Sequence, residues 1–278
     1  MKTGIFLILA VSFSFIYLSS FAQSDNIIKE TTLNTSVNSE LTLSTFSGEI
    51  NVNSWSNNEI SFKLTGSNEA VENVEVEINP KSDGNYEVKV KNKKNNSKNY
   101  NLRFELKVPK SFNLKMNTAG GDMKVNDING SIKLNTSGGD LTVKNTTGNI
   151  KLATSGGDIN VDGFEGNLNV ATSGGDITLK GTNGEINAVT SGGNIKIDYK
   201  GENNGIELTT SGGDILLALP SDVKADFSLS TSGGELKVNL PNAVYTKDKK
   251  TSKKGTINGG GKMIECTTSG GNIILENK

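Results

Sequence analysis

An acidic residue or its amide directly follows a pair of glycines at eight positions of the 278-residue sequence. These positions hold Asp122, Asp140, Asp158, Asp176, Asn194, Asp214, Glu235 and Asn272. If copies of this pattern stack as strands, the carboxylates lie about 5 Å apart, and like charges at that distance favour a bound cation. The candidate ligands of such a cation row are Asp122, Asp140, Asp158, Asp176 and Asp214.

Turn capping is the alternative role for this acidic position. Asp and Asn side chains commonly accept backbone N–H hydrogen bonds at their own turn. Asn194 and Asn272 favour this alternative, because an amide caps a turn as well as a carboxylate does. The calcium-binding nonapeptide of other β-helices also differs, since it has a third glycine before its aspartate. We therefore expect a structural role for the acidic residues, and we predict no metal site and no cofactor.

The composition lacks the commonest catalytic side chain. The sequence has no histidine, which excludes Ser-His-Asp and Cys-His catalysis and also histidine-liganded zinc. A pair of aspartates could serve glycoside hydrolysis, but that reaction needs two carboxylates in a cleft that holds a sugar. Every copy of the repeat looks alike, whereas an active site breaks a repeat. We predict a non-enzymatic protein with no catalytic residues.

The first 22 residues have the pattern of a cleaved signal peptide. Lys2 supplies the positive start, an apolar run covers residues 5–17, and Ser20 and Ala22 mark a cleavage site before Gln23. The run is shorter than the roughly 18–20 residues of a membrane-spanning helix, and no second apolar segment follows. We expect export to the periplasm, the cell surface or the medium, with no transmembrane span in the mature chain. The net charge of −1 gives no reason to expect nucleic acid as a partner.

A four-residue motif, Thr-Ser-Gly-Gly, recurs along the chain. Its copies begin at Thr118 (where alanine replaces the serine), Thr136, Thr154, Thr172, Thr190, Thr210, Thr231 and Thr268. The first four intervals are 18 residues each, and the next are 20, 21 and 37. A ninth, degenerate copy at residues 43–52 aligns without gaps on residues 152–161. A fixed period of this length is typical of a solenoid.

Each 18-residue unit contains two strand signals. Alternating apolar residues follow the glycines, as at Leu141 and Val143, and the alternation resumes after a second turn, as at Ile150 and Leu152. These short strands and regular turns leave no room for helices. We predict an all-β fold, a β-solenoid similar to a parallel β-helix, with about 18 residues and two strands in each rung. The glycine pairs indicate a tight corner with positive φ, which glycine adopts most easily.

Stacked rungs form two inward-facing ladders in this prediction. The first ladder is Met123, Leu141, Ile159, Ile177, Ile195, Ile215 and Leu236, and the second is Leu134, Leu152, Val170, Ala188, Leu208, Leu229 and Cys266. This position makes Cys266, the only cysteine, a core residue rather than a nucleophile or a disulfide partner. The motif threonine has the parity of the buried residues, so we expect it to face inward and to bond a neighbouring rung.

Two segments depart from the repeat. Residues 53–110 alternate over 60–64, 74–78, 86–90 and 102–108 like antiparallel hairpins, with a polar loop at 91–99, and we expect them to cover one end of the solenoid. Residues 241–261 carry five lysines and are expected to form a mobile loop that could contact anionic glycan or phospholipid headgroups. The predicted organisation is a signal peptide at 1–22, a first rung with a β-rich cap at 23–117, and the repeat solenoid at 118–278.

The repeat also carries a family resemblance. Val108-Pro109 leads into the segment 114–118, which precedes the serial Thr-Ser-Gly-Gly-Asp units, and this pattern resembles the putative-adhesin β-repeat family (domain of unknown function 4097) of the bacterial cell envelope. The resemblance covers about residues 40–278 and implies a surface protein without established catalytic residues. It favours an adhesin or envelope scaffold that binds a glycan or a protein. An envelope-stress or regulatory partner protein is the first alternative, and a carbohydrate-active enzyme is the second.

Overall fold

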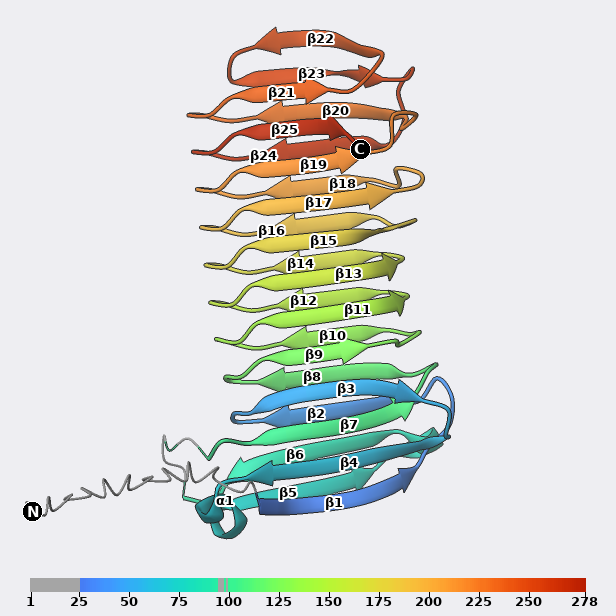
Figure 1. The fold of residues 1–278 in the computed structure, drawn as a ribbon, viewed down its shortest axis with the longest axis vertical. Coiled ribbons are helices and arrows are strands. Elements are labelled where there is room, and N and C mark those ends of the chain that lie inside the picture. Colours follow the sequence, from blue (N-terminus) through green and yellow to red (C-terminus); the bar gives the residue numbers. More distant parts are fainter. Residues whose placement is uncertain (1–25, 95–97, 99) are drawn as a thin grey trace, which may run out of the picture.

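The computed structural model describes residues 26–94, 98 and 100–278, so the predicted signal peptide lies outside the described residues. The described chain forms a long stack of rungs, and each rung gives one strand to each of two facing sheets (Figure 1). One sheet has 12 strands and the other has 13. The prediction of an all-β solenoid is confirmed.

Each sheet is a single row of strands, and neighbours in the row are hydrogen-bonded to each other. In the order of its row, the 12-stranded sheet consists of β1 (Asn26–Asn34), β4 (Glu59–Gly66), β7 (Arg103–Pro109), β3 (Glu49–Trp55), β9 (Met123–Asn126), β11 (Leu141–Thr147), β13 (Ile159–Glu165), β15 (Ile177–Thr182), β17 (Ile195–Lys200), β19 (Ile215–Leu219), β25 (Ile273–Asn277) and β21 (Leu236–Asn239). The 13-stranded sheet consists of β5 (Val74–Pro80), β6 (Tyr86–Asn92), β2 (Glu40–Thr45), β8 (Asn113–Thr118), β10 (Ile132–Asn135), β12 (Ile150–Ala153), β14 (Leu168–Ala171), β16 (Ile186–Val189), β18 (Ile206–Thr209), β24 (Met263–Thr267), β20 (Ala225–Ser230), β23 (Ser252–Ile257) and β22 (Ala243–Lys249). Two short helices, α1 (Asn68–Asn73) and a 3-10 turn at Ser82–Gly84, complete the described elements.

The core is a pair of aliphatic ladders between the two sheets. Successive strands are parallel and in register, so that Leu141 lies beside Ile159 and Leu134 lies beside Leu152. Every member of both predicted ladders is buried. The period of two within a strand and of 18 between rungs therefore places the same residue type over itself at each level, about 4.8 Å apart.

The structure requires glycine at this corner for a different reason from the predicted one. Apart from Gly121, which has φ 116°, the second glycine of the pair has no positive φ. At Gly157, for example, a Cβ would lie 2.1 Å from the carbonyl oxygen of Gly139 in the neighbouring rung. Close approach of two backbones, rather than a left-handed conformation, requires this glycine. Positive φ occurs instead at the second turn of the rung, where Gly148 has φ 127° and Gly166 has φ 122°.

The order of the last rungs also differs from the prediction. The C-terminal pair β24–β25 lies between the rung of β18–β19 and the rung of β20–β21. Cys266 consequently pairs with Leu208 on one side and with Leu229 on the other, and Ile273 separates Ile215 from Leu236. The ladders read in sequence order are therefore wrong at this end, because the edge of β20 away from β24 is already taken by the antiparallel strand β23.

The irregular N-terminal segment forms both a rung and a cap. β6 and β7 pair in parallel with β2 and β3, so residues 86–92 and 103–109 form a regular rung on that side, while β6 also forms the predicted antiparallel hairpin with β5. β1, β4 and β5 add antiparallel strands beyond that rung, at the N-terminal end of the stack (Figure 1). The first rung in the sequence, β2–β3, thus lies between the rung of β6–β7 and that of β8–β9.

The lysine-rich segment has regular structure. The prediction of a loop over residues 241–261 is wrong, because β22 and β23 form an antiparallel hairpin there, which extends the 13-stranded sheet at its C-terminal end. Tyr245 of this hairpin packs edge-on against Phe227, with 5.6 Å between the ring centroids. Lys253 pairs with Asp248 and lies over the Tyr245 ring, at 5.1 Å from its centroid. These contacts tie the hairpin to the end of the core.

Candidate functional site

The acidic residue after the glycine pair joins neighbouring rungs. The backbone N–H of Asp140 donates to Oδ1 of Asp122 at 2.9 Å, and that of Asp158 donates to Oδ1 of Asp140 at 2.8 Å. The same bond recurs with the N–H groups of Asp176, Asn194, Asp214, Asn272 and Glu235 as donors. The side chain therefore caps a neighbouring rung and not its own turn, because the N–H at this position points along the stack.

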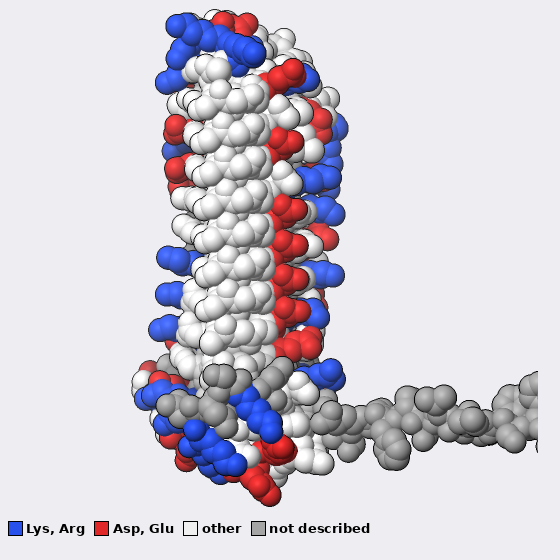
Figure 2. Space-filling model, turned by 90° about the vertical axis from the view of Figure 1, so that its left-hand side faces the viewer, with Lys and Arg blue, Asp and Glu red and all other residues white. Residues whose placement is uncertain are grey.

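This bond occupies one oxygen of each stacked side chain. Across residues 26–94, 98 and 100–278, no group of three or more His, Cys, Asp or Glu side chains is placed to hold a metal ion. The candidate residues Asp122, Asp140, Asp158 and Asp176 lie on four successive rungs, and the rung of Asn194 separates them from Asp214. Acidic side chains line one side of an uncharged edge in Figure 2. Cation binding by this row stays the alternative hypothesis to the predicted structural role.

The motif threonine binds the corner of the neighbouring rung. Thr154 is buried, and its hydroxyl donates to the carbonyl oxygen of Gly139 at 2.9 Å and accepts from the N–H of Gly157 at 3.3 Å. Thr172 and Thr190 make the same pair of bonds one and two rungs further on. The predicted inward direction of these threonines and their bond between rungs are confirmed.

The serine and first glycine of each motif form the uncharged edge in Figure 2. Ser155 and Gly156 are exposed there. A Cβ on Gly156 would come no closer than 3.8 Å to another heavy atom, so the bare surface is not imposed by packing. The motif that identifies the repeat therefore supplies hydrogen bonds and packing, and its exposed part carries no ionisable group.

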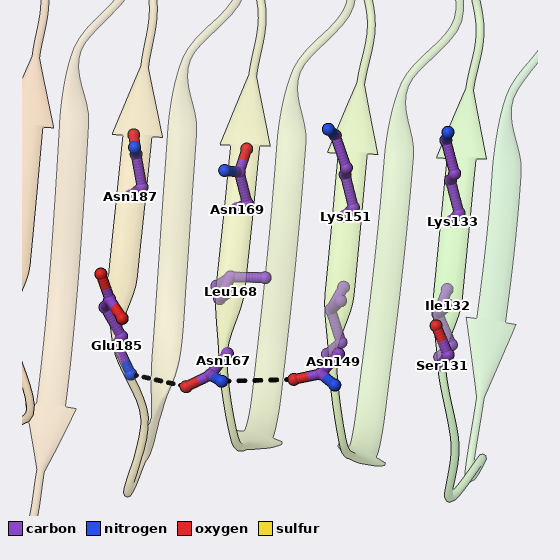
Figure 3. A pocket seen from close by; sticks show the side chains of 11 residues that line it. Ser131, Ile132, Lys133, Asn149, Lys151, Asn167, Leu168, Asn169, Glu185 and Asn187 are labelled. Atoms are coloured by element: carbon purple, nitrogen blue, oxygen red, sulfur yellow. Dashed lines mark hydrogen bonds between the residues drawn. The ribbon is translucent and has the colours of Figure 1, made fainter.

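The outer face of the 13-stranded sheet carries polar side chains whose types change from rung to rung. Its strands are four residues long in the centre of the stack, with two side chains inward and two outward. Figure 3 shows two outward rows that cross four strands. The first row is Lys133, Lys151, Asn169 and Asn187, and the second is Ser131, Asn149, Asn167 and Glu185.

These two rows line a shallow groove of about 410 Å³. Side chains of the second row are linked, because Asn167 Nδ2 donates to Asn149 Oδ1 at 3.3 Å and Glu185 N–H donates to Asn167 Oδ1 at 3.1 Å (Figure 3). No ion pair involves Lys133 or Lys151 within the described chain. The groove thus presents fixed amides beside free ammonium groups, which suits hydrogen bonding to a polar or anionic ligand.

The family follows from a match that covers most of the chain. The sequence model of the Toastrack DUF4097 family matches residues 38–276. This chain belongs to the Toastrack family. No curated protein matches the Toastrack chain significantly.

Solved structures resemble the Toastrack chain at low sequence identity. A putative adhesin from Bacteroides fragilis NCTC 9343 is 16% identical, with 92% of this chain and 99% of that chain covered and a TM-score of 0.49. A putative lipid binding protein from Parabacteroides distasonis ATCC 8503 is 16% identical, with 89% and 96% covered and a TM-score of 0.45. A putative cell adhesion protein from Clostridium sporogenes ATCC 15579 is 13% identical, with 90% and 99% covered and a TM-score of 0.31.

The thiol of the Toastrack chain lies in the core. Cys266 is fully buried between Leu208 and Leu229 of the adjacent strands. Burial, together with a smaller effect of the carboxylate of Glu265, raises the pKa of the Cys266 thiol far above its ordinary value. A thiol that stays protonated and has no access to solvent does not act as a nucleophile, so the expected core role fits the geometry.

The Toastrack chain carries a basic surface on the hairpin β22–β23. Lysine side chains gather at the top of Figure 2, at the C-terminal end of the stack. Within the hairpin, Lys247 lies directly across from Lys254, whereas Asp248 lies across from Lys253. In the part of the chain that the structure describes, no helix is long and apolar enough to cross a membrane.

The sequence reasoning followed the inward ladders and did not name the residues of the outward rows of the Toastrack solenoid. A signal was present in the sequence. The residue between two inward aliphatics, such as Lys133 between Ile132 and Leu134, is outward by the period of two. When this position is compared in successive repeats, it gives the first row of the groove, which runs from Lys133 to Asn187.

Proposed function

We propose that this protein is a non-enzymatic, exported scaffold of the bacterial cell surface that binds a glycan or a protein through the outer face of its 13-stranded sheet. The observation that supports this role most is the groove across β10, β12, β14 and β16. It offers linked amides and two lysines without intramolecular ion pairs, and these groups bind hydroxyl, carbonyl or anionic groups of a partner.

A binding role fits the remaining polar groups better than catalysis does. The acidic row uses an oxygen of each side chain to bind the backbone of the next rung. The motif threonines and Cys266 are buried. The acidic and threonine side chains bind neighbouring rungs in the same way along the regular stack, and Cys266 is enclosed in the core, so we propose that none of them is a catalytic residue.

A binding screen tests this proposal. The purified chain is applied to immobilised envelope polymers and to a glycan array, and bound ligands are then measured with the double variant Asn149→Ala/Asn167→Ala. We expect at least a tenfold loss of affinity, because the variant removes both linked amides from the groove. The matched control is Thr142→Ala/Asn160→Ala, which alters neighbouring outward positions of the 12-stranded sheet.

Two results would overturn the proposal. One is binding that survives loss of the groove amides and falls in the control variant. The other is release of a sugar product from any of these polymers that is abolished by Asp140→Ala or Asp158→Ala, which would make the protein a carbohydrate-active enzyme.

A further inference from the structure

One outward row of the 13-stranded sheet changes its charge along the stack. Its members lie on adjacent strands of the sheet. In the order of the stack they are Lys115, Lys133, Lys151, Asn169, Asn187, Glu207, Glu265 and Ser228. Three lysines therefore come first, two amides occupy the centre, and two glutamates follow. The same change, from blue to red, runs up the left margin of the stack in Figure 2.

The charges of this row have no partner among the residues that the structure describes. Among the described residues, none of the three lysines and neither glutamate forms an ion pair. The 12-stranded sheet differs, because Lys144, Asp162, Lys180 and Asp198 alternate in sign on adjacent strands. Like charges on neighbouring strands are unfavourable, so a partner with the opposite order of charges would relieve the row in the 13-stranded sheet.

A second copy of this chain has that opposite order when it is turned end for end. We propose that two copies pair face to face through the outer surfaces of their 13-stranded sheets, with antiparallel solenoid axes. A two-fold axis parallel to the strands and midway between β14 and β16 brings Lys151 opposite Glu207 of the second copy and Lys133 opposite its Glu265. Asn169 then faces Asn187, and the interface is self-complementary.

The adjoining outward row allows close approach of the two sheets. It consists of Asn135, Ala153, Ala171, Val189 and Thr209 on successive strands. Val189 is 39% exposed, and it is one of the few large apolar side chains on the surface of the described chain. The same two-fold axis places Val189 against Ala171 of the second copy. Small apolar side chains at the centre and charges along one side are the usual arrangement of a protein interface.

The size of this surface predicts a weak, salt-sensitive pair. Eight strands spaced about 4.8 Å apart and four residues of about 3.3 Å each give a face of roughly 40 by 13 Å, or about 500 Å² on each copy. A stable complex buries about 800 Å² on each partner. Ion pairs at such an interface are screened by salt.

This inference rests on the proposed function, since it uses the same face and names its protein partner as a second copy. Antiparallel pairing puts the N-terminal ends of the two copies at opposite ends of the pair. Two copies that project toward each other from two opposed cell surfaces would meet in this antiparallel orientation. The pair would then link the two cells.

Charge-swapped variants test the pairing by sedimentation equilibrium at low salt. We expect the wild-type chain to dimerise, with a dissociation constant that rises about tenfold or more when salt increases from about 50 to about 500 mM. The variants Lys133→Glu/Lys151→Glu and Glu207→Lys/Glu265→Lys are each expected to be monomeric, because each places like charges opposite one another across the pair. An equimolar mixture of the two variants is expected to dimerise again, since a lysine then faces a glutamate at each of these positions across the pair.

A matched control and two contrary results complete the test. Lys196→Glu/Lys200→Glu makes the same change of net charge on the 12-stranded sheet, and it should leave the dimer intact. A wild-type chain that stays monomeric, or a mixture of the two swapped variants that stays monomeric, overturns the pairing. Glu207 and Glu265 lie outside the groove. Groove binding by a chain that never dimerises would overturn the pairing alone, whereas loss of both self-association and groove binding would overturn the proposed function as well.

Discussion

The hydroxyl of Thr154 lies 2.9 Å from the carbonyl oxygen of Gly139 in the neighbouring rung. The same oxygen of Thr154 accepts a hydrogen bond from the N–H of Gly157. One buried side chain thus satisfies a donor and an acceptor of the corner, where the backbone cannot complete its sheet hydrogen bonds. The arrangement recurs at the motif threonines from Thr136 to Thr268, so that the motif contributes to stability at each of these rungs.

Replacing this hydroxyl should destabilise the protein. Thr154→Val keeps the shape of the side chain but leaves the Gly139 carbonyl and the Gly157 N–H buried without a partner, which costs about 1–3 kcal/mol of unfolding free energy. Urea unfolding followed by circular dichroism measures the loss. Ser155→Ala, one residue away and exposed, is the control and should change stability by less than about 0.5 kcal/mol. Equal effects of the two substitutions would contradict this role for the threonine.

The two glycines of one motif should respond in opposite ways to substitution. Gly157→Ala puts a Cβ 2.1 Å from the carbonyl oxygen of Gly139, so the rungs must separate at the corner, and we expect a loss of about 3 kcal/mol or more. Gly156→Ala meets nothing closer than 3.8 Å and restricts the unfolded chain, so its effect should lie between zero and a gain of about 1 kcal/mol. Thermal unfolding of the two variants side by side distinguishes them. A Gly157→Ala protein as stable as the wild type would contradict the close approach of the two backbones at this corner.

Substitution of an acidic residue should show whether the row serves turn capping or cation binding. Asp140→Asn retains an oxygen for the N–H of Asp158 and removes one charge from a row of like charges, so its stability should equal or exceed that of the wild type at low salt. Asp140→Ala removes the acceptor and should cost about 0.5–1.5 kcal/mol. Titration of the wild type with calcium should give no heat and no change of melting temperature. A calcium-dependent rise in melting temperature that Asp140→Asn abolishes would instead establish a cation site.

Burial of Cys266 makes stability depend on alkaline pH. Its folded-state pKa is raised, whereas the unfolded thiol titrates near about 8.5. A raised folded pKa contributes stability that is complete below the unfolded pKa and is lost as the pH rises above it. The wild type should therefore lose more unfolding free energy between about pH 8 and pH 10 than Cys266→Ala does, and its native thiol should resist alkylation at about pH 8. Rapid alkylation of the native protein would show that the thiol is accessible.

The inward half of each rung was predictable from the sequence, and the ends of the stack were not. Leu134 and Leu152 could be placed in one ladder because a period of two within strands and of 18 between rungs fixes both face and register. The position of Cys266 between Leu208 and Leu229 could not, because it depends on which strand edge is free when the last rung docks. That edge is decided by the hairpin β22–β23, whose lysines gave no strand signal strong enough to be recognised.

The same limit applies to the surface. The groove and the charged row arise from residues such as Lys151 and Asn169, whose types vary from rung to rung. Their outward direction follows from the alternation. Their meaning appears only when the strands are laid side by side, because a row of charges is a property of several rungs and not of one repeat.

The interleaved order of the rungs determines where this rod can change its length. The first rung of the sequence, β2–β3, and the last, β24–β25, are each enclosed between two other rungs. An extra unit of 18 residues placed next to β2–β3 or β24–β25 would have to separate two rungs that are already hydrogen-bonded to each other in a special order. A unit added between β8 and β19 only repeats the parallel register found there. Duplication within this central stretch would lengthen the rod by about 4.8 Å per unit and leave both ends unchanged. The fold is thus a rod whose central part can vary in length while the structures at its two ends stay the same.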